Sequence, residues 1–141
     1  MGLHKRDPNL AARTYMRLSK LRITGVADAT QVTCQFYNLW MGEDLAAETV
    51  DTDFPTGGVR FDISADGQTI TVKGMTKTAV VALIPSVDDS DVTVPWDIVP
   101  GVANGDLTIQ ANVEATGAAV DFSSIAVGLT ALIRILYLTS D

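Results

Sequence analysis

The stretch GVRFDISADGQTITVKG, residues 58–74, alternates apolar and polar side chains on both sides of an Asp66-Gly67 pair. The apolar positions are Val59, Phe61, Ile63, Ile70 and Val72. Alternation with a period of two is typical of strands that bury one face of a sheet. Asp-Gly suits the two positive-φ positions of a tight type I′ turn. The stretch therefore predicts a β-hairpin that turns at Asp66-Gly67.

The same alternation recurs in GDLTIQANVEA, residues 105–115. We expect further strands at residues 21–26, 31–41, 78–84 and 91–99. Clusters of Gly, Pro, Asp and Asn separate these segments, and strands begin roughly every ten residues, which leaves no room for crossover helices. Pro95 removes a ladder donor from its segment and predicts an edge strand or a bulge there. The chain is therefore predicted to be all-β, a single-domain antiparallel β-sandwich.

Two segments fit more than one structure. Residues 125–138, IAVGLTALIRILYL, are apolar on every side, as in a buried helix or in a strand buried on both faces. We favour the strand, because a central strand needs apolar side chains on both faces, although Leu and Ala also suit a helix. Residues 9–21 offer Asn9 as an N-cap and apolar residues at helical spacing, so this segment is either a short helix or an extended arm.

The composition bounds the class of protein. The chain has 141 residues, 47% of them hydrophobic, a mean hydropathy of +0.22 and a formal net charge of -7. This length fits one domain. The longest apolar run, twelve uncharged residues between Asp121 and Arg134, is shorter than the roughly 20 residues of a bilayer span, and no secretory signal is visible. We expect no membrane partner and synthesis in a host cytoplasm.

Few residues suit catalysis. His4 is the only histidine and Cys34 the only cysteine, so a nucleophilic triad has few candidates and a zinc site has too few ligands. Cys34 stands among apolar neighbours and is expected to be a buried small side chain. The acidic run at residues 88–91 and the pair Asp51 and Asp53 are interpreted as solvated turns in preference to calcium sites. No phosphate-binding glycine loop is present. We predict a protein without catalytic residues, metal or cofactor.

Charge divides the chain in two. The first 22 residues hold six of the ten Lys and Arg and one acid, Asp7, a balance of +5, whereas the rest of the chain has a balance of -12. We therefore predict a basic N-terminal arm, residues 1–20, and a β-sandwich domain, residues 21–141. The acidic body is expected to repel nucleic acid, and we expect the arm to contact a protein. The alternatives are that the arm is a solvated tail or that it contacts the phosphate backbone of a nucleic acid. The expected contact residues are Lys5, Arg6, Arg13, Tyr15, Arg17, Leu18, Lys20 and Arg22.

Aromatic residues suggest a second kind of surface. Phe36, Tyr37, Trp40 and Trp96 can form a carbohydrate platform, but Phe36 and Trp40 alternate in phase with Val32 and Cys34, which favours a place in the core. Tyr37 then faces the other way.

An acidic, apolar, strand-rich domain with an arm of opposite charge describes a building block. In size, acidity and β content the chain resembles the head-decoration, or cement, proteins of tailed bacteriophages. That resemblance implies a jelly-roll sandwich on the capsid exterior of the virion, which binds the major capsid protein and associates as a homodimer or homotrimer. A receptor- or carbohydrate-binding module and another virion component, such as a tail-tube or head-completion protein, are the alternatives.

Overall fold

The computed structural model describes residues 14–38, 43–44, 46–76, 80–86 and 96–140. This part of the chain contains ten strands, one 3-10 turn and no α-helix. The elements are β1 (Thr14–Gly25), β2 (Gln31–Asn38), β3 (Glu43–Asp44), β4 (Glu48–Asp51), β5 (Phe61–Ile63), β6 (Ile70–Thr76), β7 (Val80–Ser86), β8 (Trp96–Ala103), β9 (Asp106–Val113), η3 (Phe122–Ser124) and β10 (Thr130–Ser140).

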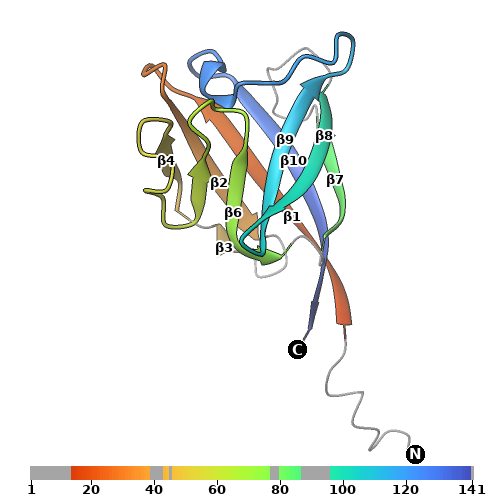
Figure 1. The fold of residues 1–141 in the computed structure, drawn as a ribbon. Helices are drawn as coiled ribbons and strands as arrows, with labels where there is room; N and C mark the ends of the chain where they lie inside the picture. Colours follow the sequence, from red (N-terminus) through yellow and green to blue (C-terminus); the bar gives the residue numbers. More distant parts are fainter. Residues whose placement is uncertain (1–13, 39–42, 45, 77–79, 87–95, 141) are drawn as a thin grey trace, which may run out of the picture.

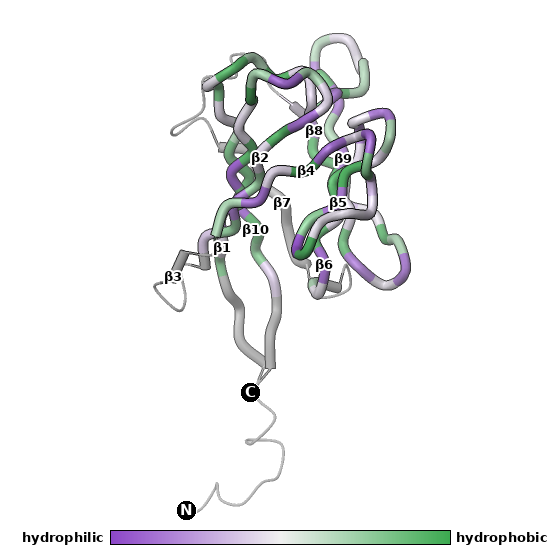
Figure 2. Tube along the Cα trace, turned by 90° about the vertical axis from the view of Figure 1, so that its left-hand side faces the viewer, coloured by the Kyte–Doolittle hydropathy of each residue, from purple (hydrophilic) through white to green (hydrophobic). Residues whose placement is uncertain are grey.

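The strands form two antiparallel sheets that pack face to face (Figures 1 and 2). The larger sheet has the order β3-β2-β1-β10-β7, with β4 also paired to β2, and the smaller sheet has the order β5-β6-β9-β8. The predicted antiparallel β-sandwich is confirmed. Its order combines hairpins, such as β5–β6, with pairs distant in sequence, such as β1–β10, and the finer jelly-roll assignment stays a prediction.

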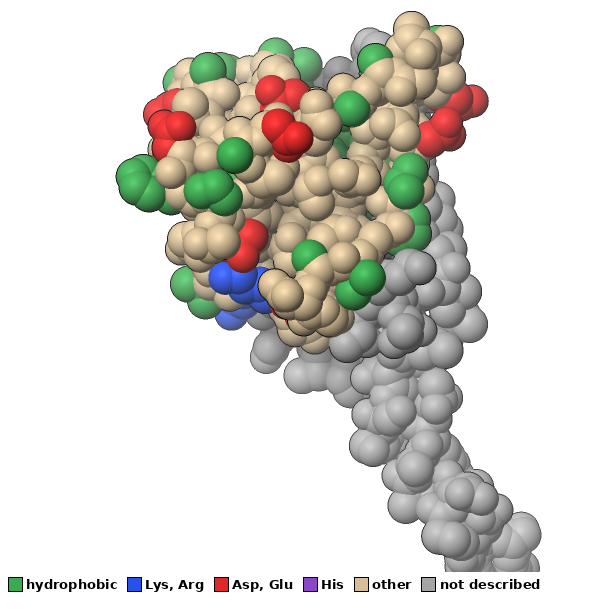
Figure 3. Space-filling model, viewed as in Figure 1, with side chains coloured by type: hydrophobic (Ala, Val, Ile, Leu, Met, Phe, Trp, Pro, Cys, Tyr) green, Lys and Arg blue, Asp and Glu red, His purple; other side chains and the backbone are tan. Residues whose placement is uncertain are grey.

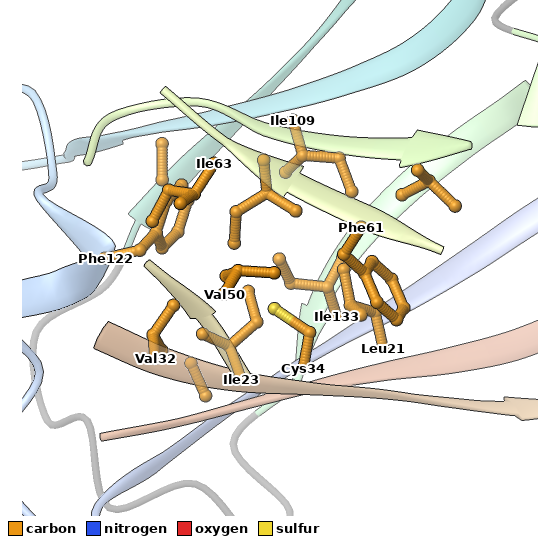
Figure 4. Packing of buried hydrophobic residues seen from close by; sticks show 14 of the residues in the cluster. Leu21, Ile23, Val32, Cys34, Val50, Phe61, Ile63, Ile109, Phe122 and Ile133 are labelled. Carbon is orange, nitrogen blue, oxygen red and sulfur yellow. The ribbon is translucent and has the colours of Figure 1, made fainter. Parts of the chain in front are cut away.

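The core lies between the sheets, where side chains of both inner faces point toward one another (Figure 4). The larger sheet contributes Leu21, Ile23, Val32, Cys34, Ile133 and Ile135, and the smaller sheet contributes Phe61, Ile63, Ile70, Val72, Leu107 and Ile109. The burial of Val32, Cys34 and Phe36 on one face of β2 confirms the interpretation of these residues as core. Trp40 and Pro95 lie outside the described residues.

The hairpin predicted from residues 58–74 is confirmed, but its turn differs. Ile63 pairs with Ile70, and Gly67 donates a backbone hydrogen bond to Ser64 at 2.9 Å. Gly67 has a φ of +74°, whereas Asp66 does not take a positive φ, so the two-residue type I′ turn predicted here is wrong. The tight primed turn lies instead between β8 and β9, where Asn104 and Gly105 both have positive φ.

The apolar C-terminal segment is a strand from Thr130 onward, as favoured, and residues 125–129 precede it. β10 is central, between β1 and β7. Ile133 and Ile135 reach the core, while Leu132 lies on the other face of the sheet and is still only 2% exposed. Apolar side chains on both faces explain why the sequence shows no alternation here.

The basic arm and the sandwich share a strand. β1 begins at Thr14 and runs through the predicted boundary at residue 20, so a helix over residues 14–21 is excluded. Residues 14–19 pair with β10 but not with β2, which joins β1 only at Lys20. The ends of β1 and β10 therefore project beyond the body as a two-stranded ribbon (Figure 1). β8 is an edge strand, with a neighbouring strand on one side only. An edge strand accommodates Pro100, because proline has no backbone N–H and the open edge of a sheet requires no donor.

Candidate functional site

The predicted contact residues fall into three groups. Lys5, Arg6 and Arg13 lie outside the described residues. Tyr15 and Arg17 belong to the ribbon, where their backbones stand opposite Thr139 and Tyr137. Leu18, Lys20 and Arg22 alternate with the inward residues Ser19, Leu21 and Ile23, and therefore share the outer face of the larger sheet.

β10 completes a patch on this outer face. Leu18 stands opposite Leu136, Lys20 opposite Arg134, and Arg22 opposite Leu132. We call Leu18, Lys20, Arg22, Arg134 and Leu136 the β1–β10 patch. It combines three cations with two leucines at the root of the ribbon, and Leu18 is 38% exposed. Such a patch suits a partner surface that presents carboxylates beside apolar side chains.

Arg22 has a defined position in the patch. Its guanidinium carbon lies 4.9 Å from the centroid of the Tyr37 ring, within the range of a cation–π contact. The hydroxyl of Tyr37 donates a hydrogen bond of 2.9 Å to Oε1 of Gln35, its neighbour on the same face of β2. Arg22 also stands beside the covered Leu132, so the aliphatic part of its side chain adjoins apolar surface. The charge is thereby held at a fixed place on the sheet.

Lys20 and Arg134 are direct cross-strand partners of like charge. Like charges directly opposite one another in an antiparallel pair lower stability by a fraction of a kcal/mol. The outer face of the larger sheet therefore carries two neighbouring positive charges at this point.

Arg134 and Leu136 were not among the contact residues predicted from the sequence. Arg134 is the one charged residue within the apolar segment 125–138, which is the signal that could have singled it out. Its closeness to Lys20 depends on the pairing of the first strand with the last, 114 positions apart by number, and no local pattern reveals such a pairing.

The other candidate sites do not form within the part of the chain that the structure describes. Burial, with a smaller contribution from the charge of Glu48, raises the pKa of the Cys34 thiol from 9.0 to about 12. Cys34 is therefore a buried thiol without thiolate character near neutral pH. Within the described ranges no group of three His, Cys, Asp or Glu side chains could hold a metal ion. Asp51 accepts the backbone N–H of Asp53 at 2.9 Å, so the two form a local turn, and residues 88–91 lie outside the described part.

The aromatic residues do not form one platform. Trp96 packs edge-to-face on the buried Phe122, with ring centroids 5.8 Å apart, whereas Tyr37 lies on the outer face of the other sheet. No helix in the described residues has the length and hydrophobicity needed to span a bilayer.

Comparisons with protein families, with curated proteins and with solved structures found no match for this chain.

Proposed function

We propose that this protein is a non-catalytic virion structural protein that binds the outside of an assembled capsid lattice and cements neighbouring major capsid subunits. The observation that supports this proposal most is the β1–β10 patch. Its cations, Lys20, Arg22 and Arg134, are ordered on a central pair of strands in a chain whose net charge is -7.

A sheet surface is suited to this role because its side chains are spaced by the backbone ladder and need little ordering when a partner binds. Apolar contact by Leu18 and Leu136 supplies affinity, while the cations select an acidic surface and speed the encounter. A protein that binds the assembled lattice better than free subunits stabilises the lattice by mass action, without any chemical step.

Co-sedimentation with empty shells, assembled from the major capsid protein of the same virus, tests the proposal. We expect the double variant Lys20→Glu/Arg134→Glu to bind at least about tenfold more weakly than the parent protein, because it opposes two like charges to the acidic partner. Raising the salt concentration should weaken the parent's binding and strengthen the variant's, because salt screens attraction in the first case and repulsion in the second.

The control is Gln110→Glu, which adds one negative charge at an exposed position on the smaller sheet, whereas the double variant changes the charge by four units, two at each cation. The control should bind like the parent protein. A loss of binding free energy by the control that is about a quarter of the loss by the double variant would show that net charge alone decides binding, and would overturn the role of the patch.

A further inference from the structure

An exposed phenylalanine lies on a hydrogen-bonded loop between β4 and β5. Phe54 is 72% exposed, although its backbone N–H donates to the carbonyl of Asp51 at 2.9 Å and its carbonyl accepts from Gly57 at 3.0 Å. Thr52 donates to Thr30 at 2.8 Å, which ties the loop to the start of β2. The loop therefore presents a large apolar side chain in a fixed position, with the carboxylates of Asp51 and Asp53 close to it in the chain.

A pocket of about 200 Å³ opens near the other end of the sandwich. Its apolar walls are Phe36 of β2, Phe61 of β5, and Val72 and Met75 of β6, and Arg60 and Lys73 add positive charge. Lys73 is held there by its hydrogen bond of 2.6 Å to the carbonyl of Gly58 and its ion pair of 3.1 Å with Asp62. Arg60 is exposed.

Loop and pocket complement each other in shape and charge. The pocket is large enough for one phenyl ring. An aromatic side chain can bury roughly 150–250 Å² of surface, so insertion of Phe54 would remove much of its exposed surface from water. The side chain that would enter is flanked by two carboxylates. The pocket that would receive it is lined by the exposed Arg60, while the charge of Lys73 is already paired with Asp62. We propose that Phe54 of one copy of this chain inserts into this pocket of a second copy, with Asp53 facing Arg60.

The two features cannot meet within one copy. Asp51 pairs with Gln31 at the first residue of β2, whereas Phe36 lies five residues further along that strand, about 17 Å away at the usual rise per residue. Figure 3 shows acidic side chains along the upper part of the molecule and basic ones at its lower left, with one acidic side chain beside the basic ones. The contact therefore joins two copies, either as a two-fold dimer in which each copy inserts its Phe54 into the other, or head to tail, as a closed ring or an open chain of copies.

Two variants that disable opposite sides of the contact provide the test, without any capsid present. Phe54→Ala removes the inserted side chain, and Met75→Trp fills the pocket from within. By sedimentation velocity, each should associate at least about tenfold more weakly than the parent protein. Val102→Ala, a change at a 61% exposed valine on edge strand β8, should associate like the parent. Circular dichroism and thermal unfolding check that each variant is folded.

Mixing distinguishes the insertion of Phe54 into a pocket from a contact between two identical patches. Phe54→Ala keeps an intact pocket and Met75→Trp keeps an intact Phe54, so an equimolar mixture should form dimers and nothing larger. The exposed pair Asp53→Lys and Arg60→Glu gives a second check: each single change should weaken association, and the double variant should restore it.

A parent protein that stays monomeric at about 1 mM would overturn this inference, as would a dimer that neither variant affects. A mixture that fails to form dimers would also overturn it. Because the measurement involves this chain alone, its failure leaves the proposed capsid contact to be judged separately.

Discussion

Replacing Lys20 by Gln should stabilise the free protein, because it removes one charge from the like-charged pair with Arg134. Cross-strand partners have Cβ atoms about 5 Å apart, and we take roughly 6.5 Å as the distance between two charges whose side chains splay. In water the repulsion of two unit charges at that separation is about 0.6 kcal/mol. The free energy of unfolding should rise by that amount, and the melting temperature by about 2 °C for a domain of this size.

Urea denaturation followed by tryptophan fluorescence measures the change. The matched control is Lys73→Gln, which deletes the hydrogen bond to the Gly58 carbonyl and the ion pair with Asp62 and should lower the free energy of unfolding by about 1 kcal/mol. Opposite signs for the two lysines support the account. If the Lys20→Gln protein is less stable than its parent, the Lys20 side chain stabilises the folded protein. The inference that Lys20 and Arg134 repel each other would then be wrong.

Three further predictions concern other parts of the sandwich. Glu48→Ala should speed hydrogen exchange at residues 59–61, because the Glu48 carboxylate accepts their three backbone N–H groups at 2.8 to 3.3 Å; unchanged exchange would contradict this. Cys34 should resist alkylation at pH 8 in the native protein and react fully in denaturant, since burial raises the pKa of its thiol to about 12. The Ser64 hydroxyl and the Gln68 N–H lower the pKa of Asp66 below 3.8, so its stabilising effect is present above that pH and is lost as the pH falls through the lower folded value. Asp66→Asn should therefore reduce the loss of stability on acidification below pH 3.8, and an unchanged pH profile would refute the assignment.

Alternation predicted most of the sandwich. Residues 58–74 and 105–115 bury one face and expose the other, so their strands were visible as a period of two. The segment 125–138 was ambiguous for a physical reason: β10 is central, and Leu132 is covered on the outer face while Ile133 is buried in the core. A strand covered on both faces has no polar face to reveal its period.

The turn at Asp66-Gly67 was assigned from a dipeptide that serves more than one turn type. Only Gly67 takes a positive φ there, whereas Asn104-Gly105 takes it at both positions. Residue type permits both conformations, and the length of the surrounding loop decides between them.

The candidate patch was only half visible in the sequence. Leu18, Lys20 and Arg22 belong to a basic stretch that attracts attention by composition, and their alternation within β1 sets them on one face. Arg134 and Leu136 join them through the pairing of the first and last strands. Local patterns carry no information on such pairings, because these depend on how the whole chain closes its sheets.

A cryo-electron microscopy reconstruction of empty shells mixed with this protein would test the central claim most directly. The account predicts density for the sandwich on the outer surface, with Lys20, Arg22 and Arg134 facing carboxylates of the major capsid protein. A reconstruction that shows the β1–β10 patch turned toward solvent, or shells that carry no density for this protein, would contradict it.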